Sequence, residues 1–276
     1  MPCREEPVDI PVDGMRIAGT LATPGARIPG VLFVHGWGGS QAQYHGRARE
    51  IAALGCVCLT FDLRGHAATS AQRETVSREN SLRDVLAAYD TLAGHAQVDR
   101  ACMAVVGSSY GGYLAAILTR QRPVRWLGLR VPALYVDEGW DMPKLELHKA
   151  HDLQAYRRRF VPARTNRALA ACAVYEGDVL IVQSERDDIV PPPVITSYRE
   201  AFVRARSLTY RCLEGADHGL TDVASQQRYT ALLGQWLGEM LPHARRDGGA
   251  TAAAVAAADR AAEKAAGTGR TPETPT

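Results

Sequence analysis

Three polar residues, each following an apolar run, could together transfer an acyl group: Ser109, Asp187 and His218. Ser109 is the centre of the pentapeptide GSSYG, which follows the apolar run CMAVV and precedes helix-forming residues. This G-x-S-x-G pattern is typical of a sharp strand-to-helix turn that exposes the serine hydroxyl, and its small flanking residues let strand and helix pass closely. The pattern by itself also fits an ordinary tight turn, so its interpretation depends on the other segments.

The acid and the base that a serine nucleophile needs both follow later apolar runs. Asp187 lies in SERDDIVPP, and we favour it over the adjacent Asp188, the alternative acid, because it stands at the D-x-x-V-P position. His218 lies in the glycine-flanked loop EGADHGL after the last run. Its imidazole could take the Ser109 proton and return it to a leaving group, while the carboxylate orients the ring and stabilises the imidazolium.

A fourth segment, HGWGG, could supply backbone donors for a tetrahedral oxyanion. It follows the apolar run LFV, and its glycines leave the backbone N–H groups free to point at a ligand. We expect the amides of Trp37 and Tyr110 to be the donors, since Tyr110 also opens a helix and benefits from its positive end. His35 and His66 are expected to brace their loops through backbone hydrogen bonds.

Short apolar runs alternate with helical patterns along the chain. The runs favour strands buried on both faces, as in a parallel sheet, and cover residues 30–36, 56–62, 102–108, 126–131, 178–184 and 208–215. The helical patterns cover residues 43–55, 77–94, 111–121, 193–205 and 224–241. Before them, Asp13-Gly14 predicts an antiparallel hairpin. We therefore expect an α/β protein with a doubly wound, mostly parallel sheet of about eight strands.

The chain is expected to hold one domain over residues 1–241. Within it, residues 132–177 contain no βα unit and are predicted to form a small lid insertion, with Trp140 and Tyr156 as candidates for the substrate pocket or for anchoring the lid. Residues 242–276 are Ala-rich, lack large apolar side chains and are predicted to be a flexible tail.

These segments together resemble the α/β-hydrolase superfamily over roughly residues 7–241, in particular carboxylesterases and dienelactone-hydrolase-like or serine-aminopeptidase-like members. The chain order Ser109, Asp187, His218 is that of the superfamily. The stretch DLRGHAATS is similar to a superfamily loop, but Ala67 stands where glycine is usual. Dienelactone hydrolases use a cysteine nucleophile, whereas the equivalent position here is Ser109.

Composition excludes several other classes of protein. The net charge of +2 argues against nucleic-acid or anionic-membrane partners. The six cysteines form no C-x-x-C pair and, lying mostly in apolar runs, predict buried reduced thiols. The N-terminus has no apolar signal segment, so we expect a cytoplasmic protein. No metal site is expected, because no carboxylate or cysteine motif accompanies His148 and His151. No organic cofactor or membrane partner is expected either.

The residues therefore predict a serine hydrolase that cleaves a small or medium carboxylic ester through an acyl-enzyme on Ser109. Thioester cleavage, amide or short-peptide cleavage and acyl transfer could use the same residues. A non-hydrolytic lyase or peroxidase-like reaction, or ligand binding without turnover, are further alternatives on this fold. The partner expected in each case is a small-molecule ester or acyl compound.

Overall fold

The computed structural model describes residues 4–23 and 28–241, and within them eight strands form one sheet in the order β1-β2-β4-β3-β5-β6-β7-β8. The strands are β1 (Arg4–Val12), β2 (Met15–Thr23), β3 (Ile28–Val34), β4 (Val57–Phe61), β5 (Val98–Ser108), β6 (Trp126–Arg130), β7 (Asp178–Arg186) and β8 (Ser207–Asp217). From β4 to β8 all neighbours are parallel. The prediction of about eight, mostly parallel strands is confirmed.

The sheet begins with the predicted antiparallel hairpin. Val12 lies opposite Met15, and the turn residues Asp13 and Gly14 have φ angles of 48° and 74°. Both angles are positive, as a two-residue turn that matches the strand twist requires. β2 then pairs antiparallel with β4, which joins the hairpin to the parallel part of the sheet.

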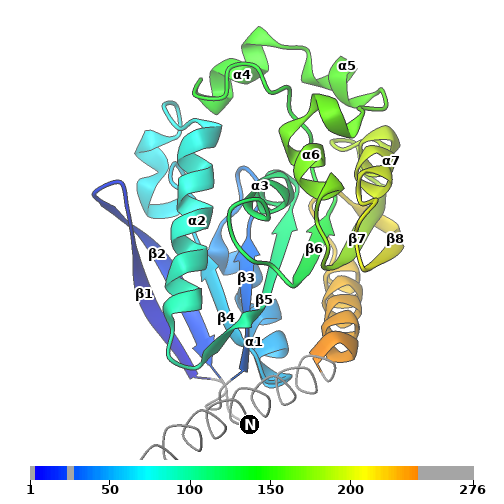
Figure 1. Cartoon of the computed structure of the whole chain (residues 1–276). Coiled ribbons are helices and arrows are strands. Elements are labelled where there is room, and N and C mark those ends of the chain that lie inside the picture. The colour runs from blue at the N-terminus through cyan, green and yellow to red at the C-terminus, as the bar shows by residue number, and fades with distance from the viewer. Residues whose placement is uncertain (1–3, 24–27, 242–276) are drawn as a thin grey trace, which may run out of the picture. The chain divides into compact units, whose positions relative to one another are not determined.

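Helices follow most strands and cover both faces of the sheet. They are α1 (His45–Ala53), α2 (Arg78–Gly94), α3 (Tyr110–Leu118), α4 (Lys144–Ala150), α5 (Leu153–Arg157), α6 (Arg167–Ala173) and α7 (Pro192–Ala201), with 3-10 turns at Gln41–Tyr44, Ala67–Gln72 and Ala163–Thr165. α2 and α3 lie in front of the sheet in Figure 1, and α1 lies behind it. Ser77 caps α2 by accepting a hydrogen bond from the Asn80 amide.

A last helix spans residues 223–241. The contacts between residues group the chain into two compact units, Met1–Gly234 and Gln235–Thr276, and the boundary falls inside this helix. The whole sheet lies in the first unit. The predicted tail, residues 242–276, lies outside the described residues. None of the helices in the described ranges is long and apolar enough to span a bilayer.

The core lies at the centre of the sheet, where helices cover both faces. β3 and β4 are buried along their whole lengths. β8, by contrast, is an edge strand, and its Cys212 is exposed while Cys56, Cys58, Cys102 and Cys172 are buried. The expectation that Cys212 is buried was wrong, because an edge strand at the end of the sheet is covered less than a central one.

The segment between β6 and β7 is built from short helices. It contains α4, α5 and α6, and Figure 1 shows α4 and α5 at the top, beyond the sheet. α6 contacts α3, the helix that begins directly after Ser109. The segment is therefore tied to the element that follows the predicted nucleophile.

Candidate active site

Ser109 occupies a strained turn between β5 and α3. Its backbone angles are φ 51° and ψ −115°, a conformation that costs a non-glycine residue about 1–3 kcal/mol. The flanking glycines allow the close approach: a Cβ on Gly107 would overlap the carbonyl of Gly111, and one on Gly111 would overlap the carbonyl of Val34. This is the geometry that the G-x-S-x-G pattern predicts.

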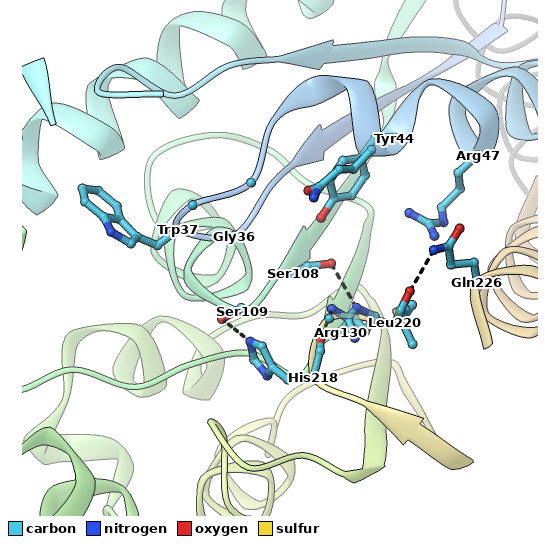
Figure 2. A pocket seen from close by; sticks show the side chains of 14 residues that line it. Gly36, Trp37, Tyr44, Arg47, Ser108, Ser109, Arg130, His218, Leu220 and Gln226 are labelled. Atoms are coloured by element: carbon cyan, nitrogen blue, oxygen red, sulfur yellow. Dashed lines mark hydrogen bonds between the residues drawn. The ribbon is translucent and has the colours of Figure 1, made fainter. Parts of the chain in front are cut away.

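Ser109, His218 and Asp187 form one hydrogen-bonded chain, although they come from three distant parts of the sequence. Nε2 of His218 lies 3.0 Å from Oγ of Ser109 (Figure 2), and Nδ1 lies 2.9 Å and 2.8 Å from the two carboxylate oxygens of Asp187. A carboxylate only accepts, so Nδ1 of His218 carries the proton. In the neutral ring Nε2 is then the acceptor for the Ser109 hydroxyl.

Asp187 is held by the backbone of its own loop. One carboxylate oxygen accepts hydrogen bonds from the amides of Ile189 at 2.9 Å and Val190 at 2.8 Å. The Asp187 side chain is only 3% exposed, whereas its neighbour Asp188 is exposed to solvent. Of the two candidate acids, the structure brings Asp187 to His218.

The loop after β3 runs beside Ser109. A Cβ on Gly36 would lie 3.3 Å from Cβ of Ser109, so the loop backbone passes directly over the serine. The amide of Gly38 donates to Nε2 of His66, and the amide of Gly39 donates to the carbonyl of Gly36. No hydrogen bond from the Trp37 amide occurs within residues 4–23 and 28–241, so this donor is available for a ligand.

Two buried histidines hold this loop in shape. Nδ1 of His35 lies 2.7 Å from the carbonyl of Gly36, and its Nε2 accepts from the amide of Leu63 at 3.0 Å. His66 accepts from Gly38 at 3.0 Å through Nε2. Burial lowers the pKa of His35 to about 4 and also lowers the pKa of His66, so both rings are neutral near pH 7. Both act as the predicted braces.

The loop that follows β4 contains Ala67, the residue that stands where the superfamily usually has glycine. Ala67 has a φ angle of 45°, in the left-handed region that favours glycine. The loop nevertheless keeps its hydrogen bonds, because Thr69 donates through its hydroxyl to the carbonyl of His66 at 2.9 Å and accepts from the amide of Gly65 at 3.1 Å.

A cavity of about 310 Å³ opens onto Ser109 and His218. It is lined by Gly36, Trp37, Gly38, Gly39, Gln43, Tyr44, Arg47, Ser108, Ser109, Arg130, His218, Gly219, Leu220 and Gln226. Its volume suits a small or medium ligand. In the described part of the chain, no group of three or more His, Cys, Asp or Glu side chains could hold a metal ion.

Neither Trp140 nor Tyr156, the two lid candidates, lines this cavity. The indole of Trp140 donates to Glu79 of α2 at 2.6 Å, and the guanidinium of Arg167 lies 4.0 Å from its ring centre. The hydroxyl of Tyr156 accepts from the side chain of Asn166 at 3.1 Å. The contact of Trp140 with α2 fits the anchoring role, whereas Asn166 belongs to the same predicted lid as Tyr156.

Arg130 is a cavity residue that the sequence reasoning missed. It is 6% exposed, and its Nη2 donates to the backbone carbonyl of His218 at 2.7 Å. It thereby supports the loop that carries His218. The available signal was its position: Arg130 ends the otherwise apolar run WLGL, where a charged side chain is unusual for a strand buried on both faces.

Comparisons with known proteins agree with this architecture. Over 210 residues the chain is 30% identical to an uncharacterized protein of Mycobacterium tuberculosis, strain H37Rv, covering 75% of this chain and 69% of that protein. It is 24% identical over 245 residues to the alpha/beta hydrolase domain-containing protein WAV2 of Arabidopsis thaliana, covering 85% of this chain and 79% of that protein.

Solved structures share the fold. Est1E from Butyrivibrio proteoclasticus with ferulic acid bound superposes with a TM-score of 0.65 at 18% identity, over 84% of this chain and 98% of that one. Dienelactone hydrolase from Anabaena variabilis gives a TM-score of 0.63 at 18% identity, over 85% and 96% of the two chains. The fold and the site thus define a hydrolase of the α/β-hydrolase type. Residues 43–243 match the prolyl oligopeptidase family, and the chain belongs to that family.

Proposed function

We propose that this protein is a serine hydrolase that cleaves a small or medium carboxylic ester through an acyl-enzyme on Ser109. The observation that carries the proposal is the hydrogen-bonded chain from Ser109 through His218 to the buried carboxylate of Asp187. The polar cavity of about 310 Å³ next to Ser109 supports it, because a substrate carbonyl needs room beside the hydroxyl.

The reaction would begin when Oγ of Ser109 attacks the ester carbonyl while Nε2 of His218 accepts its proton. Asp187 would stabilise the imidazolium through the Nδ1 hydrogen bond. His218 would then give the proton to the departing alcohol. A water that His218 deprotonates would cleave the acyl-enzyme, release the acid and restore the serine.

The amides of Trp37 and Tyr110 are proposed to bind the oxyanion of each tetrahedral intermediate. The Trp37 amide is without a hydrogen bond in the described residues, and Tyr110 is the first residue of α3. The first N–H groups of a helix have no partner within the helix, and they carry its positive dipole end. One such donor contributes about 3 kcal/mol to the transition state.

Cleavage of a short peptide or amide is the second candidate, and the match to the prolyl oligopeptidase family favours it. The same three residues would serve, with His218 protonating the departing amine. An amide differs from an aryl ester in needing this proton, since an amine anion is a poor leaving group. The two candidates therefore predict different rates on matched substrates.

A substrate panel distinguishes these functions. We suggest 4-nitrophenyl esters of increasing acyl length, a matching thioester and aminoacyl 4-nitroanilides, each with the wild type and Ser109→Ala. Ester cleavage that Ser109→Ala abolishes, with no cleavage of the nitroanilides, supports the first proposal. Cleavage of an aminoacyl nitroanilide that Ser109→Ala abolishes supports the second. If the wild type cleaves none of them and a fluorophosphonate does not label Ser109, the serine hydrolase proposal fails.

A further inference from the structure

The cavity beside Ser109 is positively charged. Its lining includes the guanidinium groups of Arg47, from α1, and Arg130, from the end of β6, and none of its lining residues is an aspartate or glutamate. Asp187 lies behind His218 and is not part of the lining. An electrically neutral ester would not need two arginines there, so the charge calls for an explanation.

Arg130 is buried without a carboxylate partner. Besides its bond to the His218 carbonyl, it has long contacts of 3.4 Å to the hydroxyls of Ser108 and Ser184, and its guanidinium lies 5.8 Å from the ring centre of Tyr229. No aspartate or glutamate forms an ion pair with Arg130 within the described residues. A guanidinium has five N–H donors, and a buried cation is costly unless a counter-charge meets it.

Arg47 is held rigidly but keeps one end open. Its Nε donates to the hydroxyl of Thr230 at 3.2 Å, and its guanidinium lies 4.5 Å from the ring centre of Tyr229 and 5.4 Å from that of Tyr44. In residues 4–23 and 28–241, neither Nη atom of Arg47 donates a hydrogen bond. Figure 2 shows Arg47 and Arg130 on the same side of Ser109, with Tyr44 above Arg130 and beside Arg47.

Resting on the proposed function of Ser109, we propose that the substrates carry a carboxylate, which Arg47 and Arg130 bind while the ester group lies at Ser109. A guanidinium pairs with a carboxylate through two parallel hydrogen bonds, which fixes the orientation of the ligand as well as attracting it. The two arginines are thus specificity residues that select anionic esters over neutral ones. Within the described residues neither guanidinium forms an ion pair with a carboxylate, and the ligand would supply one.

Matched pairs of substrates test this selection. One pair carries the charge on the acyl side: the mono-4-nitrophenyl ester of adipic acid and the methyl ester of the same compound. The other carries it on the leaving group: 4-acetoxybenzoate and methyl 4-acetoxybenzoate. We expect kcat/KM of the wild type to favour the anionic member of at least one pair by tenfold or more. No preference in either pair would overturn the proposal.

The variant to use is Arg47→Gln, since Arg130 also supports the His218 loop. We expect it to lower the anionic-to-neutral ratio of kcat/KM by tenfold or more. Arg49→Gln is the matched control: Arg49 lies on the same helix but pairs with Glu5 and is not part of the cavity lining, so the ratio should not change. An unchanged ratio in Arg47→Gln would contradict the proposal.

A binding measurement separates this inference from the function on which it rests. In Ser109→Ala, isothermal titration with each of the two anionic esters should show, for at least one of them, binding at least tenfold tighter than in Ser109→Ala combined with Arg47→Gln. Equal affinity of the two proteins for both anionic esters would refute the carboxylate site even if the wild type hydrolyses neutral esters. Tighter binding that depends on Arg47, in a protein that cleaves no ester, would refute the proposed hydrolysis and leave the carboxylate site standing.

Discussion

The carboxylate of Asp187 lies 2.8 Å from Nδ1 of His218, whereas the adjacent Asp188 points to solvent. The amides of Ile189 and Val190 hold Asp187 in this orientation by donating to the same carboxylate. The two acids are neighbours in sequence, yet only one of them can orient the imidazole.

Asp187→Asn should therefore lower kcat for an aryl ester by about 10⁴, because an amide no longer selects the required tautomer of His218. Asp188→Asn is the matched control and should stay within about twofold of the wild type, since its side chain is exposed. Steady-state kinetics on both variants decide the assignment. A large loss in Asp188→Asn with an active Asp187→Asn would reverse it.

The strained backbone at Ser109 predicts an order of stability. Its φ of 51° is unfavourable for any side chain with a Cβ, so Ser109→Gly should be about 1 kcal/mol more stable than Ser109→Ala. Because both variants lack the Ser109 hydroxyl, the loss of its hydrogen bond does not affect the difference in stability between them. Urea denaturation of the two proteins measures the difference. If the alanine variant is equally stable or more stable, the strain is not present in solution.

The close approach of α3 to β3 predicts that Gly111 cannot be replaced. Gly111→Ala would drive a Cβ into the carbonyl of Val34, and we expect a loss of several kcal/mol or failure to fold. Gly46→Ala in α1 is the control, since its Cβ would meet no atom within 4 Å and alanine favours helix by about 1 kcal/mol. Thermal unfolding should shift down in the first variant and up in the second.

Buried His35 predicts that acid destabilises the fold. Its pKa is about 4 in the folded protein and about 6.5 when unfolded, so the unfolded chain binds more protons between these values. Stability is then fully present above pH 6.5 and falls as the pH drops toward 4, by about 3 kcal/mol from this residue. His66, whose pKa burial also lowers, acts in the same direction.

His35→Asn removes this contribution and leaves the neighbouring His66 in place. The amide nitrogen of asparagine can replace Nδ1 as a donor to Gly36, but it does not titrate. The free energy of unfolding, measured in urea at several pH values, should depend less on pH in the variant between 4 and 6.5. Parallel curves for the wild type and the variant would show that His35 is not the responsible group.

Much of the fold follows from patterns within short windows of sequence. The Asp13-Gly14 turn needs only the φ preferences of two residues, and the central strands are recognisable because burial on both faces requires continuous apolar runs. The G-x-S-x-G turn at Ser109 is local for the same reason: a strand and a helix can meet there only if Gly107 and Gly111 carry no side chain.

The position of a strand within the sheet cannot be read from its own sequence, because it depends on how the other strands pair. The run that became β8 reads like the central strands, but the sheet order places it at the edge and exposes Cys212. The roles of Trp140 and Tyr156 were equally open, since either lining a pocket or anchoring a segment requires a large aromatic side chain. In the structure Trp140 donates to Glu79 of α2, outside the predicted lid, whereas Tyr156 bonds to Asn166, within it.

The sequence by itself determined which residues can react: a serine in a strained turn, an acid and a histidine after later strands. The residue types and local turn chemistry suffice for that. Only the tertiary structure decided that Asp187 rather than Asp188 meets His218, and that Arg47 and Arg130 meet in one cavity. The first fact depends on the direction of a side chain, and the second on a contact between residues of α1 and β6, which are far apart in sequence. Both arise only when the parallel strands bring their carboxyl ends together at one edge of the sheet.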